Sequence, residues 1–320
     1  MNTEKSNERM PVFENLSSIW QRRREKILKR TAKPEFPFGI EQLDKITHGI
    51  TKGKVTLIAA RTSEAKTAFT IQAAFNIADN GKNVVYISLE DDAEQIAERI
   101  FSNVREVDNQ ALITGQVSRE TIEDPVISDL FKKVKFLAIE NYGHNFDEMQ
   151  KVIDLLEPKP DLIFLDYVQM IEQLPKESEY DALSRFAQKC KKFAEVNDIG
   201  FVIVSQINRA GAKEGRPQAH HLQGCGRLEQ VCDLLLILYC PYNYEDSSHD
   251  FKQGDSEHEM RGMEECPPDY VEVNVAKNKN GMRNWIVKTR FTGKFYKFSE
   301  WKELTPEFSV PQSTGGLYAE

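Results

Sequence analysis

Short apolar runs alternate with amphipathic stretches along the chain from residue 38 onward. The apolar runs have the length of buried strands, and those before residue 240 lie at 55–60, 84–88, 134–139, 162–166, 201–206 and 234–239. Between them, apolar residues recur at helical spacing within 68–80, 93–103, 145–156 and 181–196. Continuous apolar strands separated by helices are typical of a parallel sheet covered on both faces, so the pattern predicts a doubly wound α/β fold.

The hydrophobic pattern changes after Tyr239. Residues 244–268 are rich in Glu, Asp and Ser and lack periodicity, which predicts a mobile surface loop whose His249 and His258 are solvated rather than metal ligands. Strand-like runs return at 270–276, 285–290 and 295–298. The Asn280-Gly281 and Thr292-Gly293 turns between these runs predict antiparallel hairpins on one edge of the sheet.

An amphipathic helix is predicted near the start of the chain, across 13–30. Its apolar positions are Val12, Leu16, Ile19, Trp20 and Ile27, and its basic positions are Arg22, Arg23, Arg24, Lys26, Lys29 and Arg30. Pro34 and Pro37 end the helix and begin a stiff connector. The helix either folds back on its own core or docks on another subunit. We therefore expect a disordered lead-in at 1–11, a linker helix with connector at 12–37, the α/β domain at 38–300 and a tail at 301–320.

Composition narrows the class of protein. With Lys+Arg 42 against Asp+Glu 50, the net charge of −8 argues against a protein that coats nucleic acid with its whole surface, but leaves room for a local basic groove. The five cysteines form no CxxC pair and no zinc-binding spacing, which favours a reduced, intracellular protein. No apolar run approaches the roughly 20 residues of a membrane span, so we expect no contact with a membrane.

Residues 55–67 combine an apolar strand, a polar loop and the start of a helix, which is the shape of a phosphate-binding loop. The loop residues are Ala60, Arg61, Thr62, Ser63, Glu64, Ala65, Lys66 and Thr67. Such a loop needs backbone N–H groups that cradle phosphates, a lysine for the outer phosphates and a hydroxyl that holds Mg²⁺. Lys66 and Thr67 match the last two requirements. Alanines stand at both glycine positions of the usual motif, so the loop alone is a weak signal.

Three further polar positions follow apolar strands. Glu90 follows the 84–88 strand, neighbouring the phosphate loop, where a carboxylate can activate water against a γ-phosphate; alternatively, it caps the next helix. Asp166 is the last residue of the buried strand at 162–166. This is the form of a Walker B element, in which the aspartate holds Mg²⁺. Gln206 ends the 201–206 strand, where an amide can sense the γ-phosphate. Because the carboxyl ends of parallel strands share one edge, we expect these residues and Lys66 to converge there.

In combination, these motifs resemble the C-terminal ATPase domain of DnaB-type replicative helicases, a RecA-like family, over residues 38–298. The segments that carry the resemblance are 38–44 with Gly49 and Gly53, 58–61, 88–90, 166–169, 205–209, 226–230 with Asp233, and 277–281. The pairing of Asp-Tyr-x-Gln with Ser-Gln-x-Asn-Arg is its most specific part. The resemblance implies a RecA-like fold and a phage or mobile-element origin, and it places the 13–30 helix where the family has its linker helix. We expect the family's primase-binding N-terminal domain to be absent.

The resemblance further implies a helicase or translocase that uses ATP and Mg²⁺ and assembles as a ring, usually a hexamer, around single-stranded DNA. The residues expected to act within one subunit are Lys66, Thr67, Glu90, Asp166 and Gln206. Lys277 and Lys279 would reach the γ-phosphate from the neighbouring subunit. The residues expected beside the DNA backbone are Gln223, Gly224, Gly226 and Arg227, with the loop 172–179. Replication proteins are the expected partners, in the cytoplasm of a bacterial cell or phage-infected host.

Three features depart from the family pattern. Ala65 replaces a glycine, and its Cβ either strains a positive-φ backbone by roughly 1 kcal/mol or blocks close approach to phosphate. Lys279 stands at the arginine-finger position, where it supplies a point charge without a planar guanidinium. Gln223 and Gly224 replace an Arg-Glu pair beside the DNA, for which nearby basic residues such as Arg227 either compensate or are merely solvated.

Two other functions therefore stay open. The departures fit a degenerate ATPase that serves as an oligomerising scaffold or as a regulator of an active helicase. A KaiC- or RadA-like ATPase that acts away from the replication fork is the other alternative. ATP turnover measured with and without single-stranded DNA separates the helicase from the scaffold.

Overall fold

The computed structural model describes residues 14–28, 34–62, 64–140, 144–208, 216–222, 226–244 and 267–301. The contacts divide the chain into two units, one that contains helix α1 (Leu16–Leu28) and one that begins at Glu35. The segments predicted as lead-in and tail lie outside the described residues, apart from Trp301, as does most of the acidic segment predicted at 244–268.

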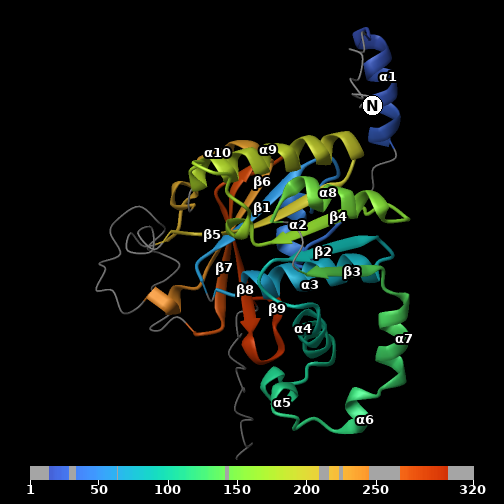
Figure 1. Ribbon diagram of the computed structural model, residues 1–320, viewed down its shortest axis with the longest axis vertical. Helices are drawn as coiled ribbons and strands as arrows, with labels where there is room; N and C mark the ends of the chain where they lie inside the picture. Colours follow the sequence, from blue (N-terminus) through green and yellow to red (C-terminus); the bar gives the residue numbers. More distant parts are fainter. Residues whose placement is uncertain are drawn as a thin grey trace, which may run out of the picture. The chain divides into compact units, whose positions relative to one another are not determined.

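A nine-stranded sheet forms the centre of the described part of the larger unit (Figure 1). Its strands are β1 (Val55–Ala60), β2 (Val84–Ser88), β3 (Phe136–Glu140), β4 (Leu162–Asp166), β5 (Gly200–Gln206), β6 (Leu234–Tyr239), β7 (Tyr270–Asn278), β8 (Trp285–Thr292) and β9 (Lys297–Glu300). Their order across the sheet is β3-β2-β4-β5-β1-β6-β7-β8-β9. The first six strands pair in parallel and the last three are antiparallel, which confirms the predicted mostly parallel sheet with C-terminal hairpins.

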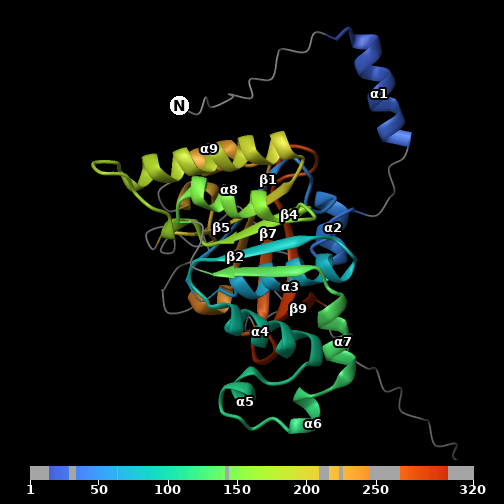
Figure 2. The same ribbon diagram turned by 45° about the vertical axis from the view of Figure 1, so that its right-hand side comes forward.

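Helices cover both faces of this sheet (Figure 2). One face carries α2 (Glu41–Thr47), α3 (Lys66–Asp79) and α4 (Ala93–Arg105), and the other carries α8 (Phe146–Leu155), α9 (Glu179–Asn197) and α10 (Gly226–Val231). Each face has its own cluster of buried apolar side chains. Strands β1, β2, β4 and β6 are buried along their whole length, as expected for strands covered on both sides.

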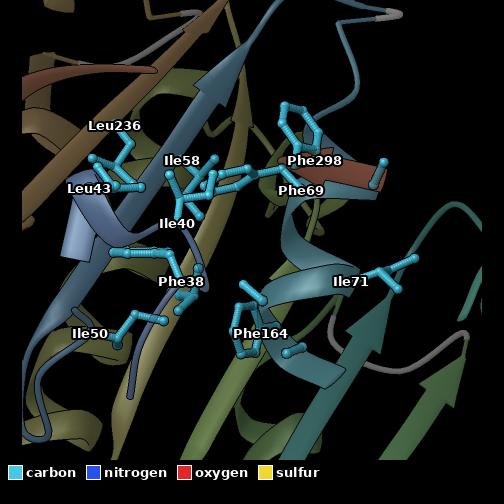
Figure 3. Packing of buried hydrophobic residues seen from close by; sticks show 14 of the residues in the cluster. Phe38, Ile40, Leu43, Ile50, Ile58, Phe69, Ile71, Phe164, Leu236 and Phe298 are labelled. Carbon is cyan, nitrogen blue, oxygen red and sulfur yellow. The ribbon is translucent and has the colours of Figure 1, made fainter. Parts of the chain in front are cut away.

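The core on the α3 face ties the segment before β1 to the last strand (Figure 3). Phe69 of α3 stacks on Phe38 with ring centroids 6.0 Å apart, and its ring meets Phe298 of β9 edge-on at 5.2 Å. The carboxylate of Asp44 in α2 accepts hydrogen bonds from the backbone N–H groups of Phe38 and Gly39, at 2.7 and 3.0 Å. Residues far apart in the chain thereby brace the helix that follows the phosphate loop.

The sequence pattern did not predict the short helices of the larger unit. These are α2, α5 (Asn109–Ile113), α6 (Arg119–Ile122), α7 (Pro125–Lys133) and α10. Neither α5 nor α6 buries a side chain, so neither has an apolar face to detect. Their beginnings are marked instead by capping side chains, Asp108 for α5 and Ser118 for α6.

Two predicted strands are displaced in the structure. The strand predicted at 134–139 begins at Phe136, because α7 extends to Lys133 and Val134 is its C-cap. A 3₁₀ turn at Gly293–Phe295 occupies the start of the run predicted at 295–298, so β9 is shifted to Lys297–Glu300. No helix among the described residues is long and apolar enough to cross a membrane. In the same part of the chain Cys190, Cys232 and Cys240 are buried and not in disulfides.

Candidate nucleotide site

The loop between β1 and α3 has the geometry of a phosphate-binding loop. Ala65 precedes the helix in the left-handed region, at φ 56° and ψ 19°, which is the conformation that a glycine adopts readily at this position. No side chain caps the first turn of α3, so its N–H groups are available to an anion. Lys66 is the first residue of the helix, and its Nζ lies 5.4 Å from the centroid of the Tyr167 ring. Ser63 lies outside the described residues.

Glu64 introduces a negative charge into this loop. Its side chain is buried, and its Oε2 accepts a hydrogen bond from the backbone N–H of Arg61 at 3.2 Å. An N–H group of a phosphate-binding loop is thereby engaged by a carboxylate of the loop itself. We expect this carboxylate to disfavour an anion bound in the loop.

Asp166 lies at the end of β4 and is almost fully buried. Its Oδ2 accepts a hydrogen bond from the Tyr86 hydroxyl at 2.8 Å, and Tyr86 in turn is hydrogen-bonded to Thr70 at 2.9 Å. Burial raises the pKa of Asp166, and this effect is opposed by the hydroxyls of Thr67 and Tyr86 and by the charge of Lys66. Asp166 is thus held beside both residues predicted for the outer phosphates and the metal.

The donor set at Asp166 fits a magnesium ion. Asp166 Oδ1 is shielded from solvent and accepts no hydrogen bond that meets normal geometry from the described residues. A buried carboxylate oxygen without a partner is destabilising unless a cation or a donor completes its environment. Asp166 Oδ1 and the nearby Thr67 hydroxyl are both hard oxygen ligands of the kind that Mg²⁺ prefers. The described residues contain no separate cluster of three or more metal-ligating side chains.

Glu90 and Gln206 meet at Tyr167. Burial first and then the charge of Glu90 raise the pKa of the Tyr167 hydroxyl, whereas a hydrogen bond with Gln206 lowers it. The predicted position of the strand before Glu90, beside the phosphate loop, is wrong. Strands β4 and β5 lie between β2 and β1. Glu90 nevertheless reaches the same edge, because Leu89 N donates to Asp166 O at 2.8 Å.

Gln169 holds the end of β5 in place. Its side-chain amide donates to Ser205 Oγ at 2.8 Å, and its Oε1 accepts from the backbone N–H of Gln206 at 3.2 Å. This contact gives a physical reason for the paired Asp-Tyr-x-Gln and Ser-Gln motifs. No role was predicted for Tyr167 or Gln169; the signal in the sequence was their place in the motif directly after Asp166.

Lys277 and Lys279 lie at the opposite edge of the sheet. Lys277 pairs with Leu235 near the beginning of β6, whereas the phosphate loop follows the end of β1. A strand of the length of β1 spans about 20 Å, so neither lysine belongs to the phosphate site of its own chain. In this chain, Lys277 Nζ donates to the carbonyl of Glu229, and Lys279 Nζ pairs with Asp233 at 3.1 Å.

The residues predicted to contact DNA are only partly described. Gln223 and Gly224 lie outside the described residues. Gly226 begins α10, and Arg227 next to it is exposed. In the predicted DNA loop 172–179, Glu177 forms a bidentate ion pair with Arg185 of α9. The hydrogen bond from Arg185 is the main reason that the pKa of Glu177 is lowered to about 2.

Comparisons with known proteins give one consistent result. The chain is 31% identical over 210 residues to a probable plasmid replicative DNA helicase of Chlamydia psittaci, covering 63% of this chain and 46% of that protein. It is 25% identical over 291 residues to the replicative DNA helicase DnaB of Helicobacter pylori, covering 82% of this chain and 59% of that protein. The chain thus spans about half the length of these curated relatives.

Solved structures share the fold at lower identity. One solved ATPase domain superposes with a TM-score of 0.76 at 22% identity, covering 91% of this chain and all of that one. A DnaB-like replicative helicase, described with its interactions with primase, gives a TM-score of 0.74 at 22% identity and covers 91% of this chain and 69% of that one. The model of the DnaB-like helicase C terminal domain matches residues 36–300, and the chain therefore belongs to that family.

Proposed function

We propose that the chain is an ATP-driven DNA helicase or translocase motor that works as a ring, with a hexamer as the expected size, on single-stranded DNA. The observation that carries this proposal is the convergence of Lys66, Asp166, Glu90 and Gln206 around Tyr167 at the carboxyl edge of the sheet. Family membership supports nucleotide binding. Ligands of doubly wound sheets bind at this edge.

Each residue has a role that its chemistry permits. Lys66 and the uncapped N–H groups of α3 bind the phosphates, and Thr67 with Asp166 would hold Mg²⁺. When bound, Mg²⁺ neutralises charge on the outer phosphates. Glu90 is exposed, so an attacking water can reach its carboxylate, which would take a proton from that water. Gln206, fixed by Gln169, contacts the γ-phosphate and signals its presence to the loop after β5.

The second half of the site comes from a neighbouring subunit. Lys277 and Lys279 stand at the edge opposite to the phosphate loop, so a head-to-tail ring would bring them to the nucleotide of the next subunit. The single-stranded DNA is expected at the segment that leads into α10 and at the loop 172–179. Replication proteins are proposed partners, since one solved relative is described in its interactions with primase.

A second function is favoured by two features of the loop itself. Ala65 places a Cβ where the backbone is left-handed, and Glu64 engages the Arg61 amide. Both weaken phosphate binding. The alternative that they favour is a scaffold that oligomerises or regulates an active helicase without hydrolysing ATP.

Turnover of ATP decides between the two. The motor should hydrolyse ATP, and single-stranded DNA should raise kcat; Lys66→Ala should abolish binding and turnover together, and Glu90→Gln should abolish turnover while ATP still binds. Lys132→Gln, at an exposed position on α7, is the matched control and should change nothing. Titration calorimetry that finds no binding at millimolar ATP would support the scaffold and reject the motor.

A further inference from the structure

Asp233 joins two lysines at the edge of the sheet opposite to the phosphate loop. It lies between α10 and β6 and is 5% exposed. Its Oδ2 accepts from Lys191 Nζ at 2.5 Å and from the backbone N–H of Val55 at 3.2 Å. Its Oδ1 accepts from Lys279 Nζ at 3.1 Å. One buried carboxylate therefore serves two cations, one of which is the residue proposed to act on a neighbouring nucleotide.

The two lysines are held unequally. The side chain of Lys191 is 20% exposed and binds Oδ2 of Asp233, whereas that of Lys279 is 46% exposed and binds Oδ1. The backbone of Lys279 is fixed, because its N–H donates to the carbonyl of Asp233 at 2.9 Å. Movement of Lys279 away from Asp233 would therefore involve its flexible side chain, with the backbone held in place.

Asp233 keeps partners when Lys279 leaves. Burial raises the pKa of Asp233, but the hydrogen bond from Lys191, the Val55 amide and Lys279 together lower it below its usual value. Removing a sole partner from a buried carboxylate is strongly destabilising. Here Lys191 and the Val55 N–H still neutralise and solvate the carboxylate, so the departure of Lys279 is much less unfavourable than it would be from a simple pair.

We propose that Asp233 is the resting partner of Lys279, and that Lys191 sets how readily Lys279 leaves it for a phosphate of the neighbouring subunit. The proposal rests on the proposed function. Asp233 and Lys191 are positioning residues in this account, since neither touches the nucleotide. Lys277 is also held within its own chain, where its Nζ donates to the backbone carbonyls of Glu229 and Gln230 in α10.

The first test measures the pairing without any activity. The full-length chain is treated briefly with the N-hydroxysuccinimide ester of acetic acid, and acetylation of Lys279 is quantified by peptide mass spectrometry. Asp233→Asn should raise the rate at Lys279 by about threefold or more, because the ion pair no longer holds Nζ, and Lys191→Gln should lower it, because Lys279 then has Asp233 to itself. Lys192→Gln, an exposed neighbour on α9, is the control. An unchanged rate at Lys279 in Asp233→Asn overturns the proposal.

The second test measures regulation through kcat. Lys191→Gln should lower kcat by about three- to tenfold at an unchanged KM, because Lys279 becomes the only cation on Asp233. Lys191→Arg should retain the rate. Asp233→Asn added to Lys191→Gln should restore it, since no carboxylate is left to hold Lys279. A loss of rate that persists in the double variant, or that Lys191→Arg shares, contradicts the role of Lys191.

Failure of the proposed function gives a different result. If the unmodified chain hydrolyses no ATP with single-stranded DNA, the motor is rejected and the proposed release of Lys279 with it. The acetylation arm then still decides whether Asp233 holds Lys279.

Discussion

At the scale of single residues, Ala65 combines a Cβ with a left-handed backbone in the phosphate loop, and we expect this to lower both stability and ATP affinity. Its φ of 56° costs a residue with a Cβ roughly 1 kcal/mol relative to glycine. Ala65→Gly should therefore raise the free energy of unfolding by about 1 kcal/mol, and it should tighten ATP binding if the Cβ obstructs the phosphates. Denaturant unfolding and titration calorimetry measure the two effects.

The other alanine of the motif supplies the control. Ala60 is the last residue of β1 and is fully buried, and its φ is not positive. Ala60→Gly should lower the unfolding free energy by about 0.5–1 kcal/mol. Equal effects of the two glycines on stability, or no gain at Ala65, would mean that the loop has adapted to alanine.

Glu64 makes a second prediction at this scale. Glu64→Gln retains an acceptor for the Arg61 N–H and removes the charge that opposes phosphate. ATP and ADP should each bind about tenfold more tightly, as measured by calorimetry at low salt. Glu41→Gln, at an exposed position in α2, should leave the affinity unchanged. If Glu64→Gln behaves like this control, the carboxylate does not face the phosphates.

At the scale of elements, Asp44 couples α2 to the segment before β1. Burial raises its pKa to about 6, against the opposing hydrogen bonds of Phe38, Gly39 and Ile40. The native state therefore binds a proton between about pH 4 and pH 6 that the unfolded state has released, and the free energy of unfolding falls as pH rises through this window. Above it the effect is constant.

Urea unfolding across pH 4 to 7 tests this coupling. The unmodified chain should lose at most about 3 kcal/mol between pH 4 and 6 through this group. Asp44→Asn should lack that part of the slope, while Asp147→Asn, at an exposed carboxylate, should retain it. If the unfolding free energies of the unmodified chain and of Asp44→Asn change in parallel with pH, the raised pKa of Asp44 is contradicted.

Elements with a strong hydrophobic pattern could be predicted from sequence, and elements defined by caps could not. The boundaries of β1, β2, β4 and β6 match the apolar runs, because burial on both faces demands uninterrupted apolar residues. Helices α5 and α6 carry no such signal, since they bury nothing.

The residues of the candidate site likewise differ in how far the sequence pattern predicts them. Lys66, Asp166 and Gln206 follow apolar strands and were predicted by position. Tyr167 and the double pairing of Asp233 depend on side-chain contacts between segments distant in sequence, which periodicity does not report.

At the scale of the whole molecule, we expect α1 to supply a surface for assembly. Its exposed apolar residues are Leu16, Ile19, Trp20, Ile27 and Leu28. An apolar row of this kind on one helix marks an interaction site, and we expect it to join subunits. A chain that begins at Lys33 should form smaller species in multi-angle light scattering. Glu25→Gln, at an exposed position on the side of α1 opposite to these apolar residues, should keep the mass of the full chain. Identical masses for the full and shortened chains would reject this role.

In the proposed ring, two subunits build each catalytic site, with Glu90 from one and Lys279 from the next. Mixing subunits that carry Lys279→Ala with subunits that carry Glu90→Gln tests it most directly, because some interfaces in a mixed ring then hold both intact residues. We expect each variant alone to have little turnover and the mixture to recover a substantial fraction of the unmodified rate. If the unmodified protein is active and the mixture recovers nothing beyond the sum of its parts, Lys279 does not act across the interface.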